Sequence, residues 1–133
     1  MECLDRMNLT ILIIEDNEQN RYLATFLLER HGHTVVAAVD GLQGLQLAAS
    51  LVPDLILLDI QLPRMDGYAV ARALRALECD APIIAVTSYA MVGDREKCLA
   101  AGCTGYIEKP IDPDSFVAEI AAIASAARSG VRP

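Results

Sequence analysis

The chain has 133 residues and a formal net charge of −7, from 11 lysines and arginines and 18 aspartates and glutamates. Its length fits one domain with a hydrophobic core, and its acidity argues against non-specific binding of nucleic acid through a basic surface. Although 53% of the residues are hydrophobic, no uninterrupted apolar run approaches the ~18 residues of a membrane span.

The N-terminal residues and the cysteines predict a cytoplasmic protein. The first residues, MECLDRMN, carry charge early and contain neither an apolar segment nor a cleavage site of small residues, so no signal peptide is expected. His31 and His33 flank a glycine at a predicted helix end and are expected at the surface rather than as metal ligands. The cysteines lack Cys-x-x-Cys spacing, which favours reduced thiols; they are Cys3, Cys79, Cys98 and Cys103.

Apolar runs and segments of helical periodicity alternate along the chain. Strands are predicted at 9–14, 34–39, 55–59, 83–86 and 106–107. A helix follows each strand; the first is capped by Asp16 or Asn17 and ends at Gly32, the fourth spans 91–101 and the fifth about 113–127. Five such units predict a parallel sheet with helices on both faces. The apolar residues at helical spacing, which mark the inner helix faces, are Tyr22, Leu23, Phe26, Leu27, Leu42, Leu45, Ala48, Ala49, Val70, Leu74, Leu77, Phe116, Val117, Ile120, Ile123 and Ala124.

The segment LILLDIQLPRMDG (55–67) contains the third strand and the aspartate at its end. A run that is apolar at every position is typical of a strand covered on both faces. Asp59 stands where this run ends, and Pro63 and Gly67 mark the loop that follows. A lone aspartate at such a place is more often a turn or capping residue. The other strand ends decide between that interpretation and a chemical role.

Polar groups follow four of the predicted strands. Glu15 and Asp16, Asp59, Thr87 and Lys109 each lie just past an apolar run, and the carboxyl ends of parallel strands meet at one edge of a sheet. Three crowded carboxylates repel one another, and Mg²⁺ removes that cost where carboxylates and phosphate oxygens share a site. An aspartate that accepts phosphate needs such a metal, a cation and a hydroxyl donor. The alternative is a salt-bridge cluster that only holds the sheet edge together, for which three carboxylates and one lysine are poorly balanced.

Four motifs in this order resemble a response-regulator receiver domain: IIEDNEQN (13–20), LLDIQLPRMDG (57–67), AVTSYA (85–90) and YIEKPI (106–111). The resemblance extends over nearly the whole chain, as a single receiver domain of residues 1–133 with a core from about 9 to 127. It implies a flavodoxin-like (βα)5 fold, with a doubly wound five-stranded parallel sheet of order 2-1-3-4-5.

The resemblance also implies a role for each residue at the strand ends. Asp59 is the expected phosphoacceptor, Asp16 binds Mg²⁺ directly, Glu15 assists partly through water, and the backbone carbonyl of Gln61 completes the protein's share of the metal shell. Lys109, expected in a cis peptide with Pro110, contacts the phosphate. The expected switch residues are Thr87 and Tyr106, and the Ser88 amide is expected to reach the phosphoryl group.

Four positions depart from the family pattern or tune it. Glu15 stands where aspartate is usual, which leaves metal binding credible, and Ser88 stands where alanine is frequent. Gln61 and Tyr89 occupy the two positions that tune how fast the phosphate hydrolyses in this family. A bulky Tyr89 could obstruct the attacking water, so a longer-lived phosphoaspartate is expected than with a small residue.

The implied function is a switch of a two-component phosphorelay rather than an enzyme acting on external substrates. Phosphate would come from a histidine kinase or a histidine phosphotransfer protein, with slow autodephosphorylation. The face of the fourth helix, fifth strand and fifth helix would then bind a downstream protein or a second receiver, although its alanines could equally just pack on the sheet. Direct binding of nucleic acid or membrane is not expected. The sequence leaves open a stand-alone protein or a domain of a hybrid kinase or longer regulator.

Two other functions fit the same topology less well. A Mg²⁺-dependent phosphatase of the haloacid dehalogenase type carries a second aspartate two positions after its nucleophile, where this chain has Gln61. A flavin-binding module would need a phosphate loop rich in serine, threonine and glycine after the first strand. Glu15 and Asp16 stand there instead, and their charges would repel the phosphate.

Overall fold

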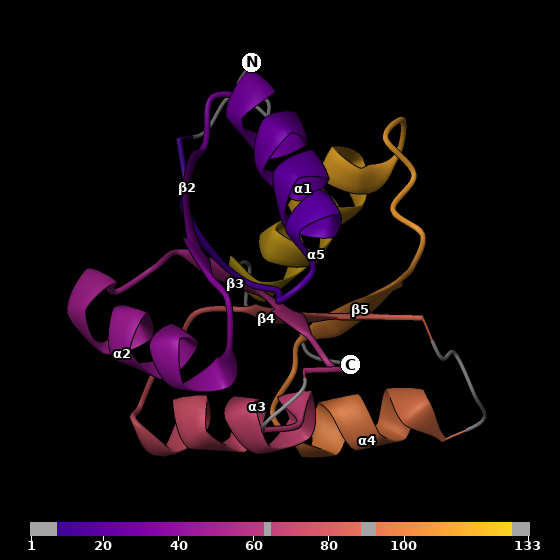
Figure 1. The fold of residues 1–133 in the computed structure, drawn as a ribbon. Helices are drawn as coiled ribbons and strands as arrows, with labels where there is room; N and C mark the ends of the chain where they lie inside the picture. Colours follow the sequence, from indigo (N-terminus) through magenta and orange to yellow (C-terminus); the bar gives the residue numbers. More distant parts are fainter. Residues whose placement is uncertain (1–7, 63–64, 89–92, 129–133) are drawn as a thin grey trace.

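The computed structural model describes residues 8–62, 65–88 and 93–128, and it has five strands and five helices in strict alternation (Figure 1). All four strand pairings are parallel, in the order β2-β1-β3-β4-β5, which confirms the predicted fold class. The elements are β1 (Thr10–Ile14), α1 (Glu18–Arg30), β2 (Thr34–Ala38), α2 (Gly41–Leu51), β3 (Leu55–Asp59), α3 (Gly67–Ala76), β4 (Ile83–Thr87), α4 (Asp94–Ala100), β5 (Gly105–Glu108) and α5 (Phe116–Arg128).

The sheet separates two hydrophobic cores. Helices α1 and α5 cover one face, and α2, α3 and α4 cover the other (Figure 1). Alternate residues of β1 serve the two sides: Ile11 and Ile13 pack toward α1 and α5, whereas Leu12 and Ile14 pack in the core of the opposite face. Every residue of β3 and β4 is buried, which is why both segments are uninterrupted apolar runs up to their last residues, Asp59 and Thr87.

The last two helices are shorter than predicted. Helix α4 begins at Asp94 rather than at 91, after Gly93 at a φ of 95°; Met91 and Val92 lie outside the described residues. Helix α5 begins at Phe116 rather than near Pro113, because the Asp112 carbonyl accepts from the Ser115 amide and its side chain accepts from the Asp114 amide, which makes a turn first. Of the two predicted caps of α1, Asn17 is the one used, and its side chain accepts from the Asn20 amide.

Several side chains predicted to face inward are exposed. In α1, Tyr22 is 70% and Phe26 45% exposed; their rings stack with centroids 6.2 Å apart, and Arg30 lies over Phe26. The buried residues of this helix are Ala24, Leu27 and Leu28. In α2 the prediction of Leu42 and Ala49 was wrong because the buried residues of the helix are Gly41, Gly44 and Ala48. A Cβ on Gly44 would collide with Ile14 of β1, and one on Gly41 would collide with Val70 of α3. Leu77, just after α3, is also exposed.

His33 is buried, at 7% exposure, and not at the surface as predicted. Its Nδ1 accepts a hydrogen bond from the Leu9 amide at 3.2 Å. The reason lies in how α1 ends: the His33 amide donates to the Leu28 carbonyl and the Gly32 amide donates to the Glu29 carbonyl, a Schellman motif whose last residue packs back on the helix. Gly32 supplies the left-handed conformation, with a φ of 89°.

Helices α3 and α4 end in the same motif. Cys79 donates to Leu74, and Cys103 donates to Cys98, in the position that His33 has in α1. The left-handed residue is Gly102 after α4 but Glu78 after α3, where φ is 61° and a side chain is costly. Cys79, Cys98 and Cys103 are free thiols, and Cys3 lies outside the described residues.

One arginine joins the ends of α3 and α4. The Arg75 guanidinium donates from Nε to the Gly102 carbonyl at 2.9 Å, and from Nη1 to the carbonyls of Cys79 at 2.6 Å and Ala81 at 2.9 Å. These carbonyls precede β4 and β5, so the contact lies at the amino-terminal edge of the sheet. Within the described residues, no helix combines the length and the apolarity needed to cross a membrane.

Candidate functional site

The polar residues that follow the strands meet at the carboxyl edge of the sheet. Glu15 and Asp16 follow β1, Asp59 and Thr87 end β3 and β4, and Lys109 follows β5. The parallel registers place Ile14 beside Leu58, Asp59 beside Val86, and Thr87 beside Glu108, so the strands end at the same level. The convergence expected from the sequence is therefore present in the fold.

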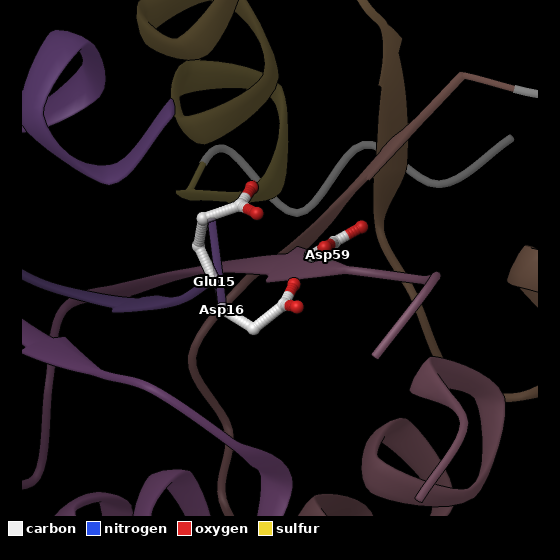
Figure 2. Close-up of side chains that lie close together, drawn as sticks. All are labelled: Glu15, Asp16 and Asp59. Atoms are coloured by element: carbon white, nitrogen blue, oxygen red, sulfur yellow. The ribbon is translucent and has the colours of Figure 1, made fainter. Parts of the chain in front are cut away.

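Three carboxylates from two neighbouring strands form an acidic cluster. Glu15, Asp16 and Asp59 each offer one oxygen atom, and these atoms lie within 4.8 Å of one another. Figure 2 shows the three side chains gathered at the ends of β1 and β3. Glu15 and Asp59 are buried and Asp16 is exposed, which leaves one side of the cluster open to solvent. An all-oxygen set with access to water is the environment that Mg²⁺ prefers.

Lys109 is the cation beside this cluster. Its Nζ lies 3.2 Å from Glu15 Oε1 and 3.5 Å from Asp59 Oδ1, and its side chain is only 12% exposed. The peptide bond between Lys109 and Pro110 is cis, as the resemblance implies. Within the described residues, the ion pairs to this cluster come from the Lys109 ammonium alone, whose single positive charge is smaller than the negative charge of three ionised carboxylates. A divalent cation would add positive charge among these oxygen atoms, so the residues present fit a magnesium ion.

Glu15 is the carboxyl group most strongly affected by this crowding. Burial, and then the nearby charge of Asp59, raise the pKa of Glu15 to about 7, against the opposing effects of Lys109 and of a hydrogen bond from the Asn17 amide. Glu15 consequently holds a proton through much of the acidic range in the absence of a metal. Because a metal binds the ionised form, its arrival would release that proton.

The loop after β3 folds back onto Asp59. The Gln61 amide donates to Asp59 Oδ1 at 3.0 Å, and the Gly67 amide donates to the Ile60 carbonyl at 3.0 Å. A Cβ on Gly67 would lie 2.8 Å from the Asp59 carbonyl oxygen and would also collide with Ile60 Cα, so only glycine permits this approach. The sequence indicated Gly67 only as a mark of the loop after the third strand, and the structure shows that its missing Cβ lets its backbone approach Asp59 and Ile60.

Comparison with known proteins identifies the family. The model of the response regulator receiver domain matches residues 11–121. The chain belongs to the response regulator receiver family. The predicted family is thereby confirmed, and this receiver domain is a component of two-component signalling.

Relatives and solved structures agree with this assignment. The polar-differentiation response regulator DivK of Brucella ovis is 42% identical over 116 residues, which are 86% of this chain and 94% of that protein. The receiver domain of the sensor histidine kinase PA1611 from Pseudomonas aeruginosa PAO1 is 36% identical, with a TM-score of 0.81 over 90% of this chain and 99% of that one. Its crystal structure contains a magnesium ion coordinated in the active-site cleft. A CheY-like receiver domain from Methanospirillum hungatei JF-1 is 27% identical, with a TM-score of 0.85 over 93% of this chain and 99% of that one.

Of the remaining predicted residues, Thr87 and Ser88 lie at the end of β4, next to β3 in the sheet. Thr87 is buried, at 4% exposure, and Ser88 is exposed, with its amide donating to Gln61 Oε1 at 3.2 Å. Tyr106 is half-buried in β5 and pairs with Ala85 of β4, and the Arg95 guanidinium carbon lies 5.9 Å from its ring centroid. Tyr89 lies outside the described residues, so its predicted effect on phosphate lifetime stays a prediction.

Arg21 is a site residue that the sequence did not indicate. Its Nη1 donates to the Glu15 carbonyl at 2.9 Å, and the Asn17 amide donates to Glu15 Oε2 at 3.1 Å. Together these bonds fix both the backbone and the side chain of Glu15 at the turn between β1 and α1. A basic residue one turn into the helix that follows an acidic strand end was the available signal, since its side chain can reach back to the turn.

Proposed function

We propose that this receiver domain accepts a phosphoryl group on Asp59 from a histidine kinase or a histidine phosphotransfer protein. The observation that carries the proposal is the position of Lys109, whose Nζ lies 3.2 Å from Glu15 and 3.5 Å from Asp59 beside three converging carboxylates. This arrangement provides a buried nucleophile, a cation for the incoming group, and an oxygen-rich site for a divalent ion.

Magnesium is the proposed cofactor. Asp16 and Asp59 would bind it directly, Glu15 partly through water, and the Gln61 backbone carbonyl would supply a further oxygen. When bound, the ion neutralises the charge of the acids and of the phosphoryl oxygens. Support comes from the three carboxylate oxygens within 4.8 Å and from the magnesium ion in the related PA1611 receiver domain.

In the proposed transfer, one Asp59 carboxylate oxygen forms a bond to phosphorus while the bond from phosphorus to the donor histidine nitrogen breaks. The histidine is left neutral after it regains a proton from solvent. Lys109, the Thr87 hydroxyl and the Ser88 amide would contact the phosphoryl oxygens. The positions of Thr87 and Ser88 at the end of β4, next to β3 in the sheet, support these roles.

The proposed output is a change in the surface of α4, β5 and α5. Movement of Thr87 toward the phosphoryl group would open room for Tyr106 to turn inward, away from Arg95. The changed face would bind a downstream protein or a second receiver, in the cytoplasm and without direct contact to nucleic acid or membrane. Residues 1–133, with a core from about 9 to 127, would act as one receiver domain and as a switch without turnover of external substrates.

The test is phosphorylation with acetyl phosphate and Mg²⁺, followed by intact-protein mass spectrometry. The wild type should gain one phosphoryl group, Asp59→Asn should gain none, and chelation of Mg²⁺ should abolish the gain. Asp80→Asn, which changes an exposed aspartate before β4, is the matched control and should be labelled like the wild type. Equal labelling of Asp59→Asn would reject the proposal, and steady hydrolysis of p-nitrophenyl phosphate would favour the phosphatase instead.

A further inference from the structure

Gln61 connects the proposed phosphoacceptor to the loop that follows β4. Its backbone amide donates to Asp59 Oδ1 at 3.0 Å, while its side-chain Oε1 accepts from the Ser88 amide at 3.2 Å. Because the partner of the side chain is a backbone N–H, the carbonyl end of the glutamine must face Ser88. One residue therefore bonds both to the nucleophile and to the strand end that carries Thr87 and Ser88.

The second of these bonds uses a donor that phosphate binding would also need. A backbone amide has a single hydrogen, and it makes one good hydrogen bond at a time. In the unphosphorylated structure the Ser88 hydrogen is directed at Gln61. A phosphoryl oxygen on Asp59 can accept from Ser88 only after Gln61 has released it.

We propose that the side chain of Gln61 is a positioning residue that holds the Ser88 amide in the unphosphorylated state and competes with the phosphoryl group for it. This inference rests on the proposed function, because it assigns the competing acceptor to a phosphoryl group on Asp59. It concerns the side chain alone and is separate from the backbone carbonyl proposed for the metal. Without the glutamine oxygen, the Ser88 amide would be available and the occupied state would be reached at lower cost.

The first measurement needs no phosphate. In ¹⁵N-labelled protein, hydrogen exchange of the Ser88 amide is compared between the wild type and Gln61→Met, which keeps the length of the side chain but removes the acceptor. Ser88 should exchange faster in the variant. The matched control is Gln43→Met, because Gln43 Oε1 accepts from the Val39 amide at 2.8 Å in the same kind of bond two strands away from Asp59. That variant should affect Val39 and leave Ser88 unchanged.

The second measurement is the affinity for beryllofluoride with Mg²⁺, in which the fluorine atoms stand for phosphoryl oxygens. Gln61→Met should bind about 2- to 10-fold more tightly than the wild type, the range that one neutral hydrogen bond contributes. Gln43→Met should bind like the wild type. Urea unfolding of each variant shows that the fold is retained.

The outcomes separate this inference from the function on which it rests. Unchanged Ser88 exchange in Gln61→Met, or beryllofluoride affinity equal to or weaker than that of the wild type, overturns the role of Gln61 and leaves the proposed function intact. Failure of the wild type itself to bind beryllofluoride rejects the proposed function and this inference with it. Faster Ser88 exchange together with tighter binding supports both.

Discussion

Lys109 and Glu15 form the closer of the two ion pairs at the acidic cluster, with 3.2 Å between Nζ and Oε1. The lysine is therefore shared between Glu15 and the proposed phosphoacceptor rather than reserved for the latter. A divalent ion at the cluster would compensate Glu15 and leave the ammonium for a phosphoryl oxygen. The charge balance of the site thus links metal binding to the availability of Lys109.

Replacing Lys109 should destabilise the metal-free protein more than the metal-bound one. Lys109→Met leaves buried carboxylates without their cation, and we expect a loss of about 2 kcal/mol in the free energy of unfolding at pH 8. Saturating Mg²⁺ should recover most of it. Urea unfolding with and without Mg²⁺ measures both values, and Lys97→Met, on the exposed side of α4, is the control. An equal loss in both buffers would show that Lys109 acts through packing rather than through its charge.

Glu15 should make the stability of the metal-free protein fall as pH rises. Its pKa of about 7 in the folded state, against 4.5 ordinarily, means that the folded protein holds this proton more tightly than the unfolded chain. The stabilisation is complete below about pH 4.5 and is lost as pH rises through about 7, by an amount on the order of 2 kcal/mol. Urea unfolding in EDTA from pH 5 to 8 should show this slope in the wild type relative to Glu15→Gln. A constant difference across that range would contradict it.

Gly67→Ala should disturb the proposed acceptor, whereas Gly44→Ala should not. The new Cβ at position 67 meets backbone atoms of Asp59 and Ile60, which cannot move without shifting the end of β3. We expect a loss of about 1–3 kcal/mol in stability and weaker Mg²⁺-dependent beryllofluoride binding. At position 44 the three nearest atoms to the new methyl group all belong to the side chain of Ile14. Urea unfolding and beryllofluoride binding are measured for both variants. Beryllofluoride binding of Gly67→Ala equal to that of the wild type would count against the role given to this glycine.

Arg75→Met should lower stability without changing the site. Its guanidinium donates to three backbone carbonyls at the ends of α3 and α4, and bonds from a charged group contribute more than neutral ones. We expect the free energy of unfolding to fall by about 2–4 kcal/mol. This is less than the sum of three separate hydrogen bonds, because the three bonds share one side chain. Arg72→Met changes an exposed arginine of the same helix and should cost little. Urea unfolding distinguishes them, and similar stabilities would refute the proposed importance of these bonds.

The features that could be predicted best from the sequence are those that depend on a local pattern of residues, namely the strands and the polar residues at their ends. The buried strands β3 and β4 are apolar at every position before their last residues, Asp59 and Thr87, and the acids and the lysine lie at or just past strand ends. Both the sheet and the convergence of Glu15, Asp59 and Lys109 could therefore be expected. The order of the strands came from the family resemblance, because no local pattern encodes which strands are neighbours. These polar residues could be predicted once the strands were predicted, because each of them lies at the end of an apolar run or shortly after it.

Predictions failed where a distant contact decides the outcome. Tyr22 and Phe26 have the spacing of an inner face, but Ala24 and Leu28 have it too, and the second pair is the one that packs in the core with residues of β1 and α5. The end of α1 turns His33 back onto the helix, and there its Nδ1 accepts from the Leu9 amide, 24 positions away. The bonds from Arg75 to Gly102 and from Ser88 to Gln61 each join residues 27 positions apart, so nothing in the neighbouring sequence indicated them.

The Arg75 contacts and the acidic cluster lie at opposite edges of the same sheet. A mutational scan that scores cellular abundance and phosphate acceptance separately should therefore give different patterns of scores for the two edges of the sheet. Substitutions around Arg75 should reduce both scores in proportion, since fewer molecules are folded. Substitutions of Asp59 should abolish acceptance while leaving abundance unchanged or higher, because removing one carboxylate relieves repulsion among the acids.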